Sequence, residues 1–368
     1  MKNTLESVLM PLEQYMRGSI CLDESSPFYG GLLETVPHTP NPVWSHTSYA
    51  TADAYLRLYE AYGSPSYWEM AKTMVEFLIR EQTEAGCWFG YTGYHKDAGW
   101  TEQNAPPGSK LNLRMEDGTI LDIIRSPFSM FGTALYSKVV ANALPIAEKI
   151  ESQKAAKWRS SFVMAAEFLR CMIDEDGYWV GDRAWNQRAA VAVTLFTAAA
   201  LLGPDRYLKK AQVILDQVLQ AQLNSGEYPY FDGEGRTYHY HALTLCFLNQ
   251  IHELTPDERV ERSVRKGLDW MWGMQKSDGD FDWSIHAPND HKTRLSSTFG
   301  LALRATAPYL PDYRESVYKV LQFLREHQNS DGGFALKIGL RNSDAPISGE
   351  TFLGLAELAK YVLRSGKT

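Results

Sequence analysis

The sequence predicts an all-α protein whose helical hairpins close into an (α/α)6 barrel. The first observation is the run from 189 to 202, which carries no charge and only two hydroxyl side chains. This run is too long for a buried strand and too weakly hydrophobic for a membrane span, so it predicts a helix that is buried on all sides. Such a helix is typical of the inner wall of a helical barrel.

The second observation is a repeat of such runs along the chain. Intervals of 50, 56 and 54 residues separate the last four runs, which begin at Arg188, Tyr238, Arg294 and Ser348. Repeats of this length are typical of stacked helical units. The six expected inner helices lie near 45–62, 125–144, 185–202, 238–254, 294–310 and 348–363. Amphipathic segments follow the first five, and they predict outer helices near 67–82, 154–173, 206–222, 258–275 and 313–328.

The two ends of the chain are expected to meet. The segment 5–16 is helical in pattern, and the sixth inner helix has no outer successor, so we expect this segment to close the ring. Residues 19–43 are rich in proline and glycine and predict an irregular segment across one mouth. A closed ring shares one core, so residues 1–368 are predicted to form a single domain.

A long excursion, 84–124, interrupts the repeat after the first hairpin. It contains Trp88 and Trp100, and alternating segments flank an Asp-Gly pair at 117–118, which predicts a short β-hairpin. Loops of this length in compact domains are usually functional or disordered. The aromatic residues favour an ordered flap over the pocket.

Composition excludes several classes of partner. The net charge is −7 with no basic tract, so nucleic acid is not an expected partner. The four cysteines have no pairing or metal spacing and predict reduced thiols. The N-terminal segment lacks a secretory signal and no membrane span is recognised, which predicts a cytoplasmic protein without a membrane partner. The sequence leaves the oligomeric state open.

The loops that precede the inner helices share a turn. Residues 275–281 and 328–334 both read Gln-x-x-Asp-Gly-x-aromatic, and weaker copies begin at Gln82, Asp174 and Gln222. Glycine in such a turn can adopt positive φ after the outer helix ends. The pattern resembles that of the α/α-toroid proteins, which include terpenoid cyclases, protein prenyltransferases and toroid-fold polysaccharide lyases and hydrolases. The resemblance implies the toroid fold, and a fold does not imply a function.

Two subgroups of that superfamily are disfavoured by missing motifs. The chain has no Asp-x-Asp-Asp motif of the class II terpene cyclase kind and no zinc constellation of the prenyltransferase kind. The connections after the inner helices are short, whereas those before them are long and rich in polar and aromatic residues. We therefore expect the chemistry at the N-terminal ends of the inner helices, where unpaired N–H groups and helix dipoles favour an anion.

The candidate site residues at these helix starts are rich in arginine, histidine and tyrosine. They are His46, Arg125, Asn186, Arg188, Tyr238, His239, Tyr240, His241, Arg294 and Glu350, joined by Trp88 and Trp100 from the long loop. Some have structural explanations as well: Asn186 as an N-cap, Glu350 as an acid favoured at a helix start, and the arginines as ion-pair partners. The strongest signal is the run of four phenols and imidazoles at 238–241, of which about two are expected to face the pocket.

This inventory suits β-elimination on a uronate-containing sugar. Asn186 or Arg188 can neutralise the substrate carboxylate, and the histidines and tyrosines can act as base and acid. The resemblance to toroid-fold lyases implies the same assignment, with an asparagine at one helix start and a tyrosine and a histidine nearby. Their counterparts here are Asn186, Tyr238, His239, Tyr240 and His241. This chemistry requires no metal and no cofactor, and the expected partner is an anionic carbohydrate.

Several alternatives stay open. Glycoside hydrolysis, as in the unsaturated-uronide hydrolases, requires two facing carboxyl groups, for which Glu350 and loop aspartates are candidates. A uronate C5-epimerase would use nearly the same residues as a lyase. A terpenoid-cyclase-like enzyme or a non-catalytic sugar-binding toroid is also compatible with the fold. The sequence therefore predicts a carbohydrate-active enzyme for acidic oligo- or polysaccharides, with lyase chemistry first and hydrolase chemistry second.

Overall fold

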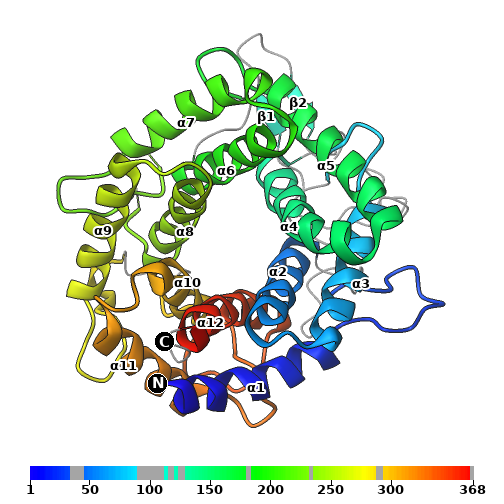
Figure 1. Cartoon of the computed structure of the whole chain (residues 1–368). Helices are drawn as coiled ribbons and strands as arrows, with labels where there is room; N and C mark the ends of the chain where they lie inside the picture. The colour runs from blue at the N-terminus through cyan, green and yellow to red at the C-terminus, as the bar shows by residue number, and fades with distance from the viewer. Residues whose placement is uncertain are drawn as a thin grey trace.

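The structure, a computed structural model, is a ring of helices two layers deep. It describes residues 1–33, 45–88, 112–114, 120–122, 129–179, 184–231, 235–286 and 293–364. Within these ranges it contains twelve α-helices, three short 3-10 helices and one two-stranded sheet. Figure 1 shows one set of helices around the centre and a second set around the outside. The predicted (α/α)6 toroid is confirmed.

The even-numbered helices form the inner ring: α2 (Ser45–Tyr62), α4 (Met130–Ile150), α6 (Trp185–Leu202), α8 (Tyr238–Leu254), α10 (Ser296–Thr306) and α12 (Ala345–Arg364). The odd-numbered helices form the outer ring: α1 (Lys2–Gly18), α3 (Pro65–Glu81), α5 (Ser152–Met172), α7 (Leu208–Gln220), α9 (Glu258–Gly273) and α11 (Arg314–His327). Three 3-10 helices lie at Pro204–Arg206, Trp283–Ile285 and Ala307–Tyr309.

Burial explains the sequence pattern of each ring. Every residue of α6 from 189 to 199 is buried, because the helix has neighbours on all sides. The outer helix α9 buries only one face, made by Val260, Val264, Leu268 and Met271. An inner helix therefore reads as apolar all round and an outer helix as amphipathic.

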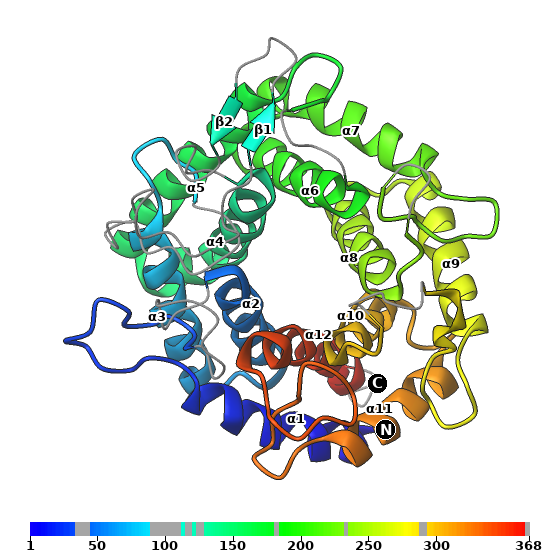
Figure 2. The same cartoon turned by 180° about the vertical axis from the view of Figure 1, so that it is seen from behind.

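Helix α1 closes the ring, as the sequence predicts. It contacts α11 and α12, and Figure 2 shows it lying along the outside of α12, next to α11. Its apolar face is fully buried at Leu5, Val8, Leu9, Leu12 and Met16. The side-chain amide of Gln328 donates to the carbonyl of Val8 at 2.9 Å and fixes α1 to the end of α11.

The repeated turn links each outer helix to the next one. Gln222 donates through Nε2 to the carbonyls of Gly226 and Ser263, both at 2.8 Å. Gly226 has φ of 112°, and a Cβ added to it would lie 2.5 Å from the carbonyl oxygen of Lys266. The turn therefore requires glycine for both its backbone conformation and its close approach to α9.

The predicted β-hairpin is also present. Strand β1 (Asn112–Arg114) pairs antiparallel with β2 (Ile120–Asp122), and Leu113 lies opposite Leu121. Apart from these strands, the expected flap at 84–124 lies outside the described residues beyond Trp88. None of the helices in the described ranges has the length and apolar character needed to cross a membrane.

Candidate active site

The inner helices run in the same direction, so their N-terminal ends gather at one mouth. His239 at the start of α8 contacts Ser297 at the start of α10, and Asn249 near the end of α8 donates to the carbonyl of Ala305 near the end of α10. Side chains at the helix starts therefore meet around the axis of the barrel.

A histidine and a carboxylate from two different helices face each other at this mouth. Nε2 of His239 lies 3.9 Å from Oε2 of Glu350, and both residues are more than nine-tenths buried. A separation of 3.9 Å exceeds a direct hydrogen bond, so a substrate group can lie against both atoms. The pair joins α8 to α12 across the ring.

The other nitrogen of His239 faces two hydroxyl groups. Nδ1 lies 3.4 Å from Oγ of Ser297 and 3.5 Å from Oγ1 of Thr298. A hydroxyl can donate or accept a hydrogen bond, so this environment supports either tautomer of the imidazole. Nε2 can therefore hold a proton or accept one, which is what general acid–base chemistry requires.

Tyr240 forms an aromatic wall beside His239. Its ring stacks on that of Tyr230, with centroids 3.8 Å apart and an angle of 11° between the planes. The His239 ring meets the Tyr240 ring edge-on at 5.2 Å. Aromatic faces of this kind suit stacking against sugar rings.

We group Asn186 and Tyr49, which also lie near the starts of inner helices, with His239, Tyr240 and Glu350 as the upper site. The Oδ1 atom of Asn186 is buried and has no hydrogen-bond partner in the described part of the chain. Burial, together with the charge of Glu350, raises the pKa of the Tyr49 hydroxyl, and Arg304 opposes this shift. Tyr49 therefore lies within electrostatic reach of both Glu350 and Arg304.

Tyr238 and His241 do not belong to this site, contrary to the expectation from the sequence. The Tyr238 hydroxyl donates to the carbonyl of Asp282 at 2.6 Å, and its ring packs against Phe281. Nδ1 of His241 accepts from the backbone N–H of Tyr228 at 3.0 Å, and Nε2 donates to the carbonyl of Gly267 at 3.0 Å.

Helical geometry explains this division of the 238–241 run. Residues three apart share one face of a helix, so Tyr238 and His241 both point toward α9, while His239 and Tyr240 face the mouth. Burial lowers the pKa of His241 to about 4 and keeps its ring neutral. Both residues therefore stabilise the ring of helices.

Arg188 and Trp88 also have structural roles that the sequence did not predict. The Arg188 guanidinium bonds to Gln217 of α7 and lies 4.4 Å from the ring centroid of Tyr178, so it points to the outer ring. Trp88 is 1% exposed and donates through Nε1 to the carbonyl of Leu78 at 2.7 Å. Neither side chain is placed to contact a substrate in the barrel.

Arg294 lies at the rim of the mouth. Its side chain is 45% exposed, and Nη2 is 3.4 Å from Oδ2 of Asp280. His46 falls within α2, but its side chain, like Arg125 and Trp100, lies outside the described residues. Within the described ranges, no group of three or more histidine, cysteine, aspartate or glutamate side chains is arranged to hold a metal ion.

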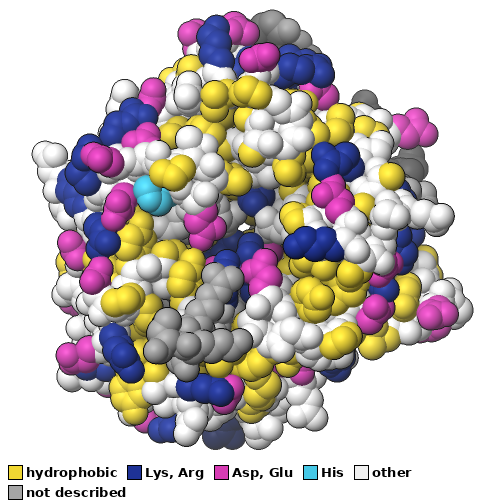
Figure 3. Space-filling view, in the orientation of Figure 1, with side chains coloured by type: hydrophobic (Ala, Val, Ile, Leu, Met, Phe, Trp, Pro, Cys, Tyr) yellow, Lys and Arg dark blue, Asp and Glu magenta, His cyan; other side chains and the backbone are white. Residues whose placement is uncertain are grey.

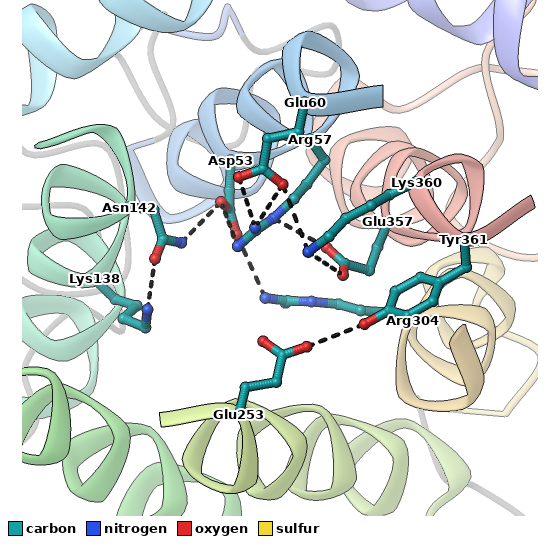
Figure 4. A network of polar contacts seen from close by, with 10 residues as sticks. All are labelled: Asp53, Arg57, Glu60, Lys138, Asn142, Glu253, Arg304, Glu357, Lys360 and Tyr361. Carbon is teal, nitrogen blue, oxygen red and sulfur yellow. Dashed lines mark hydrogen bonds and ion pairs between the residues drawn. The ribbon is translucent and has the colours of Figure 1, made fainter. Parts of the chain in front are cut away.

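A network of charged and polar residues lines the axis of the barrel below the upper site (Figure 4). We call it the charged network, and its members are Asp53, Arg57, Glu60, Lys138, Asn142, Glu253, Arg304, Glu357, Lys360 and Tyr361. Figure 3 shows acidic and basic side chains around the central hollow at the other end of the ring. Asp53 holds the network together, because it is 3.4 Å from Arg57, 3.5 Å from Arg304 and hydrogen-bonded to Asn142.

Sequence reasoning missed most of this network. Only the four-residue spacing of Asp53 and Arg57, which places both on one face of α2, indicates part of it. The available signal was the presence of charged residues, such as Lys138 and Arg304, in helices that are otherwise apolar all round. In such a helix a charge has no solvent side to face, so it must be paired or line the interior.

Comparisons with known proteins support the fold. No protein-family model and no curated protein sequence matches the chain. Among solved structures, the chain is similar to a D-mannose isomerase, with 12% identity over 99% of this chain and 98% of that chain and a TM-score of 0.65. It is also similar to a family 88 glycosyl hydrolase from Bacteroides vulgatus, with 10% identity over 97% and 99% of the two chains and a TM-score of 0.64. A polysaccharide lyase is 12% identical over 86% and 90% of the two chains, with a TM-score of 0.59. These likenesses show that the chain has the α/α-toroid fold.

Proposed function

We propose that the protein is a carbohydrate-active enzyme that removes a proton from a sugar carbon, and that its reaction is β-elimination on a uronate-containing saccharide. The observation that carries the proposal is the His239–Glu350 pair at the mouth. Toroid proteins similar to this chain include a lyase, a hydrolase and an isomerase that act on carbohydrates, which favours a sugar as the substrate.

The upper site supplies each role in an elimination. With its proton on Nδ1, held by the hydroxyls of Ser297 and Thr298, His239 accepts the C5 proton of the uronate at Nε2. Glu350 then stabilises the imidazolium through its negative charge. The Tyr240 hydroxyl donates a proton to the leaving oxygen, and the C4–O bond breaks as the C4–C5 double bond forms. The Asn186 amide binds the substrate carboxylate and stabilises the negative charge that develops on it.

Absorbance at the enol-ether band tests this proposal directly. Saturated uronate oligosaccharides are incubated with the wild-type protein, His239→Gln and Glu350→Gln. We expect absorbance to rise with the wild type, and kcat/KM to fall by about 10²- to 10⁴-fold in His239→Gln, the range found for loss of a general acid or base.

His241→Gln is the matched control, because the same change is made two residues away in a side chain that faces α9. We expect this variant to retain activity at temperatures where it is folded. The proposal fails if no saturated uronate substrate gives the absorbance change, or if His239→Gln is as active as the wild type.

Epimerisation or isomerisation is the second candidate, because two proton-transfer groups, His239 and Glu350, meet at the mouth. Such a reaction uses the same first step, and it returns the proton to carbon without breaking a C–O bond. In D2O, deuterium would enter the sugar without a rise in enol-ether absorbance, and NMR would detect it. Loss of absorbance from an unsaturated uronide would instead identify a hydrolase.

A further inference from the structure

A narrow cavity lies in the barrel axis where the upper site meets the charged network. Its polar lining consists of Tyr49, Asp53, Lys138, Gln250 and Arg304, and apolar side chains of α4, α6 and α8 complete the wall. The cavity has room for about one water molecule. Five of the six inner helices contribute to it, so it lies on the axis of the ring.

Arg304 brings an unused hydrogen-bond donor to this cavity. The residue is 8% exposed, and its Nη2 lies 3.5 Å from Oδ2 of Asp53. Its Nη1 is buried and has no hydrogen-bond partner in the described ranges. Figure 4 shows the guanidinium directed toward the centre of the ring. A buried donor without a partner is unfavourable, and more so when it is charged, so a bound acceptor would stabilise this arrangement.

Lys138 is the second cation that lines the cavity. Its Nζ donates to Oδ1 of Asn142 at 2.5 Å, and no carboxylate of the described chain lies within ion-pair distance of it. Burial, aided by Arg57 and Arg304 and opposed by Asp53 and Glu253, lowers the pKa of Lys138 to about 8. Burial is the largest cause of this shift, so a negative charge bound in the cavity would stabilise the ammonium.

The charges that line the cavity do not balance. Lys138 and Arg304 contribute two positive charges and Asp53 one negative charge, which leaves +1. Asp53 is also shared with Arg57, at 3.4 Å. Of the remaining acids of the charged network, Glu357 pairs with Arg57 at 3.0 Å, and Glu253 accepts a hydrogen bond from Tyr361 at 3.1 Å and acts on Lys138 only through its electrostatic field.

We propose that this cavity is an anion-binding site, in which Lys138 and Arg304 hold one oxygen of a carboxylate or a small inorganic anion. Tyr49 connects it to the upper site, because this residue lines the cavity and lies within electrostatic reach of Glu350. A carboxylate of an acidic saccharide, other than the one that Asn186 binds, is one source of this anion. That source of the anion rests on the proposed function, whereas a resident inorganic anion does not.

Lys138→Gln tests the site while leaving the Asp53–Arg304 pair intact. Glutamine can still bond to Asn142, and the variant removes a buried cation that forms no ion pair in the described part of the chain, so we expect it to fold. The matched control is Lys360→Gln, which removes the same charge from a lysine that already has Glu357 and Glu60 as partners.

Crystals soaked with bromide provide the first readout. We expect an anomalous peak between Nζ of Lys138 and the guanidinium of Arg304 in the wild type and in Lys360→Gln, and no peak in Lys138→Gln. Calorimetric titration with a uronic acid and with its neutral parent sugar provides the second readout. Binding of the acid alone, weakened about tenfold or more by Lys138→Gln, identifies a substrate carboxylate as the anion.

If the bromide peak is present but the titration shows no preference for the acidic sugar, the anion is a resident inorganic ion. This outcome also supports the site. Absence of bromide together with equal binding of both sugars would overturn the inference. If the wild type performs elimination and Lys138→Gln leaves KM unchanged, the carboxylate source fails and the proposed function stands. If elimination is absent but bromide binding depends on Lys138, the anion site stands and the proposed function fails.

Discussion

His239 and His241 lie two residues apart on α8 and have opposite environments. His239 faces Glu350 and two hydroxyl groups that accommodate either of its tautomers. His241 is fully buried, and backbone groups of Tyr228 and Gly267 occupy both of its nitrogens. The first arrangement allows proton transfer, and the second holds α8 against α9 and the preceding turn.

His241 should make the stability of the fold depend on pH. Burial lowers its pKa from the ordinary histidine value of 6.5 to about 4 in the folded protein, so the unfolded chain binds the extra proton between these values. The contribution of the neutral His241 ring to the free energy of unfolding is fully present above pH 6.5 and is lost as the pH falls from 6.5 to 4. It amounts to about 3 kcal/mol. We expect urea denaturation to show a smaller loss of stability over this interval in His241→Gln than in the wild type. Parallel pH profiles would contradict this assignment.

Asn186 should matter for activity more than for stability. Its buried Oδ1 has no hydrogen-bond partner in the described part of the chain. A 180° rotation of the side-chain amide would place Nδ2 at the same position. Asn186→Leu should therefore change the free energy of unfolding by less than about 1 kcal/mol and lower kcat/KM about tenfold or more. Asn249→Leu is the control, because Asn249 donates to Ala305 at the far end of the barrel. It should lose stability and keep its activity, and the opposite pattern would remove Asn186 from the site.

The sequence predicts which residues stand at helix starts, but not where each side chain points. Arg188 and Arg304 both lie in helices that are buried on all sides, yet Arg188 bonds to Gln217 of the outer ring and Arg304 to Asp53 at the axis. The difference depends on the rotation of each helix about its own axis, which packing against neighbours decides. The sequence could therefore predict only a list of candidate site residues. That list contained His239, which faces the mouth, and also His241, which faces α9.

At the scale of elements, all twelve helices could be predicted, because burial imposes a different pattern on each ring. Their ends follow local signals that the pattern alone does not contain. The fourth helix begins at Met130 rather than near 125, because the Ser129 hydroxyl caps it by accepting from the N–H of Gly132. Helix α10 ends at Thr306, and the 3-10 helix Ala307–Tyr309, which contains Pro308, follows in place of further α-helix.

The turn glycines set how closely successive outer helices approach, and a matched pair separates this effect from backbone strain. Gly226 and Gly203 both have φ of 112°, but only Gly226 would place a Cβ against backbone, 2.5 Å from the carbonyl oxygen of Lys266. Gly203→Ala should lower the free energy of unfolding by about 1–3 kcal/mol through backbone strain alone. Gly226→Ala should lower it further, because α9 must also move. Chemical denaturation measures both. Equal costs would show that the turn does not depend on this close approach.

At the scale of the whole molecule, charged side chains pair across the inside of the ring, and α1 closes the ring from outside. The charged network contains four acids, Asp53, Glu60, Glu253 and Glu357, and four bases, Arg57, Lys138, Arg304 and Lys360, and it spans α2, α4, α8, α10 and α12. Its charges therefore cancel over the network, while the cavity at its upper end keeps a local excess of +1. Repeat spacing predicts the ring, but it cannot predict pairs such as Asp53–Arg304, Arg57–Glu357 and Lys360–Glu60, because these join helices that are distant in sequence.

Removal of α1 should open the ring. The helix buries five large apolar side chains against α11 and α12, and each contributes about 1.5–3 kcal/mol. Their sum is comparable to the whole stability of a typical domain, about 5–15 kcal/mol. We therefore expect a chain of residues 19–368 to lose cooperative thermal unfolding by circular dichroism and to aggregate on size-exclusion chromatography. Leu9→Ala, which removes one of the five, should fold with a lowered Tm. Cooperative unfolding of the 19–368 chain near the wild-type Tm would show that the other five hairpins close the barrel without α1.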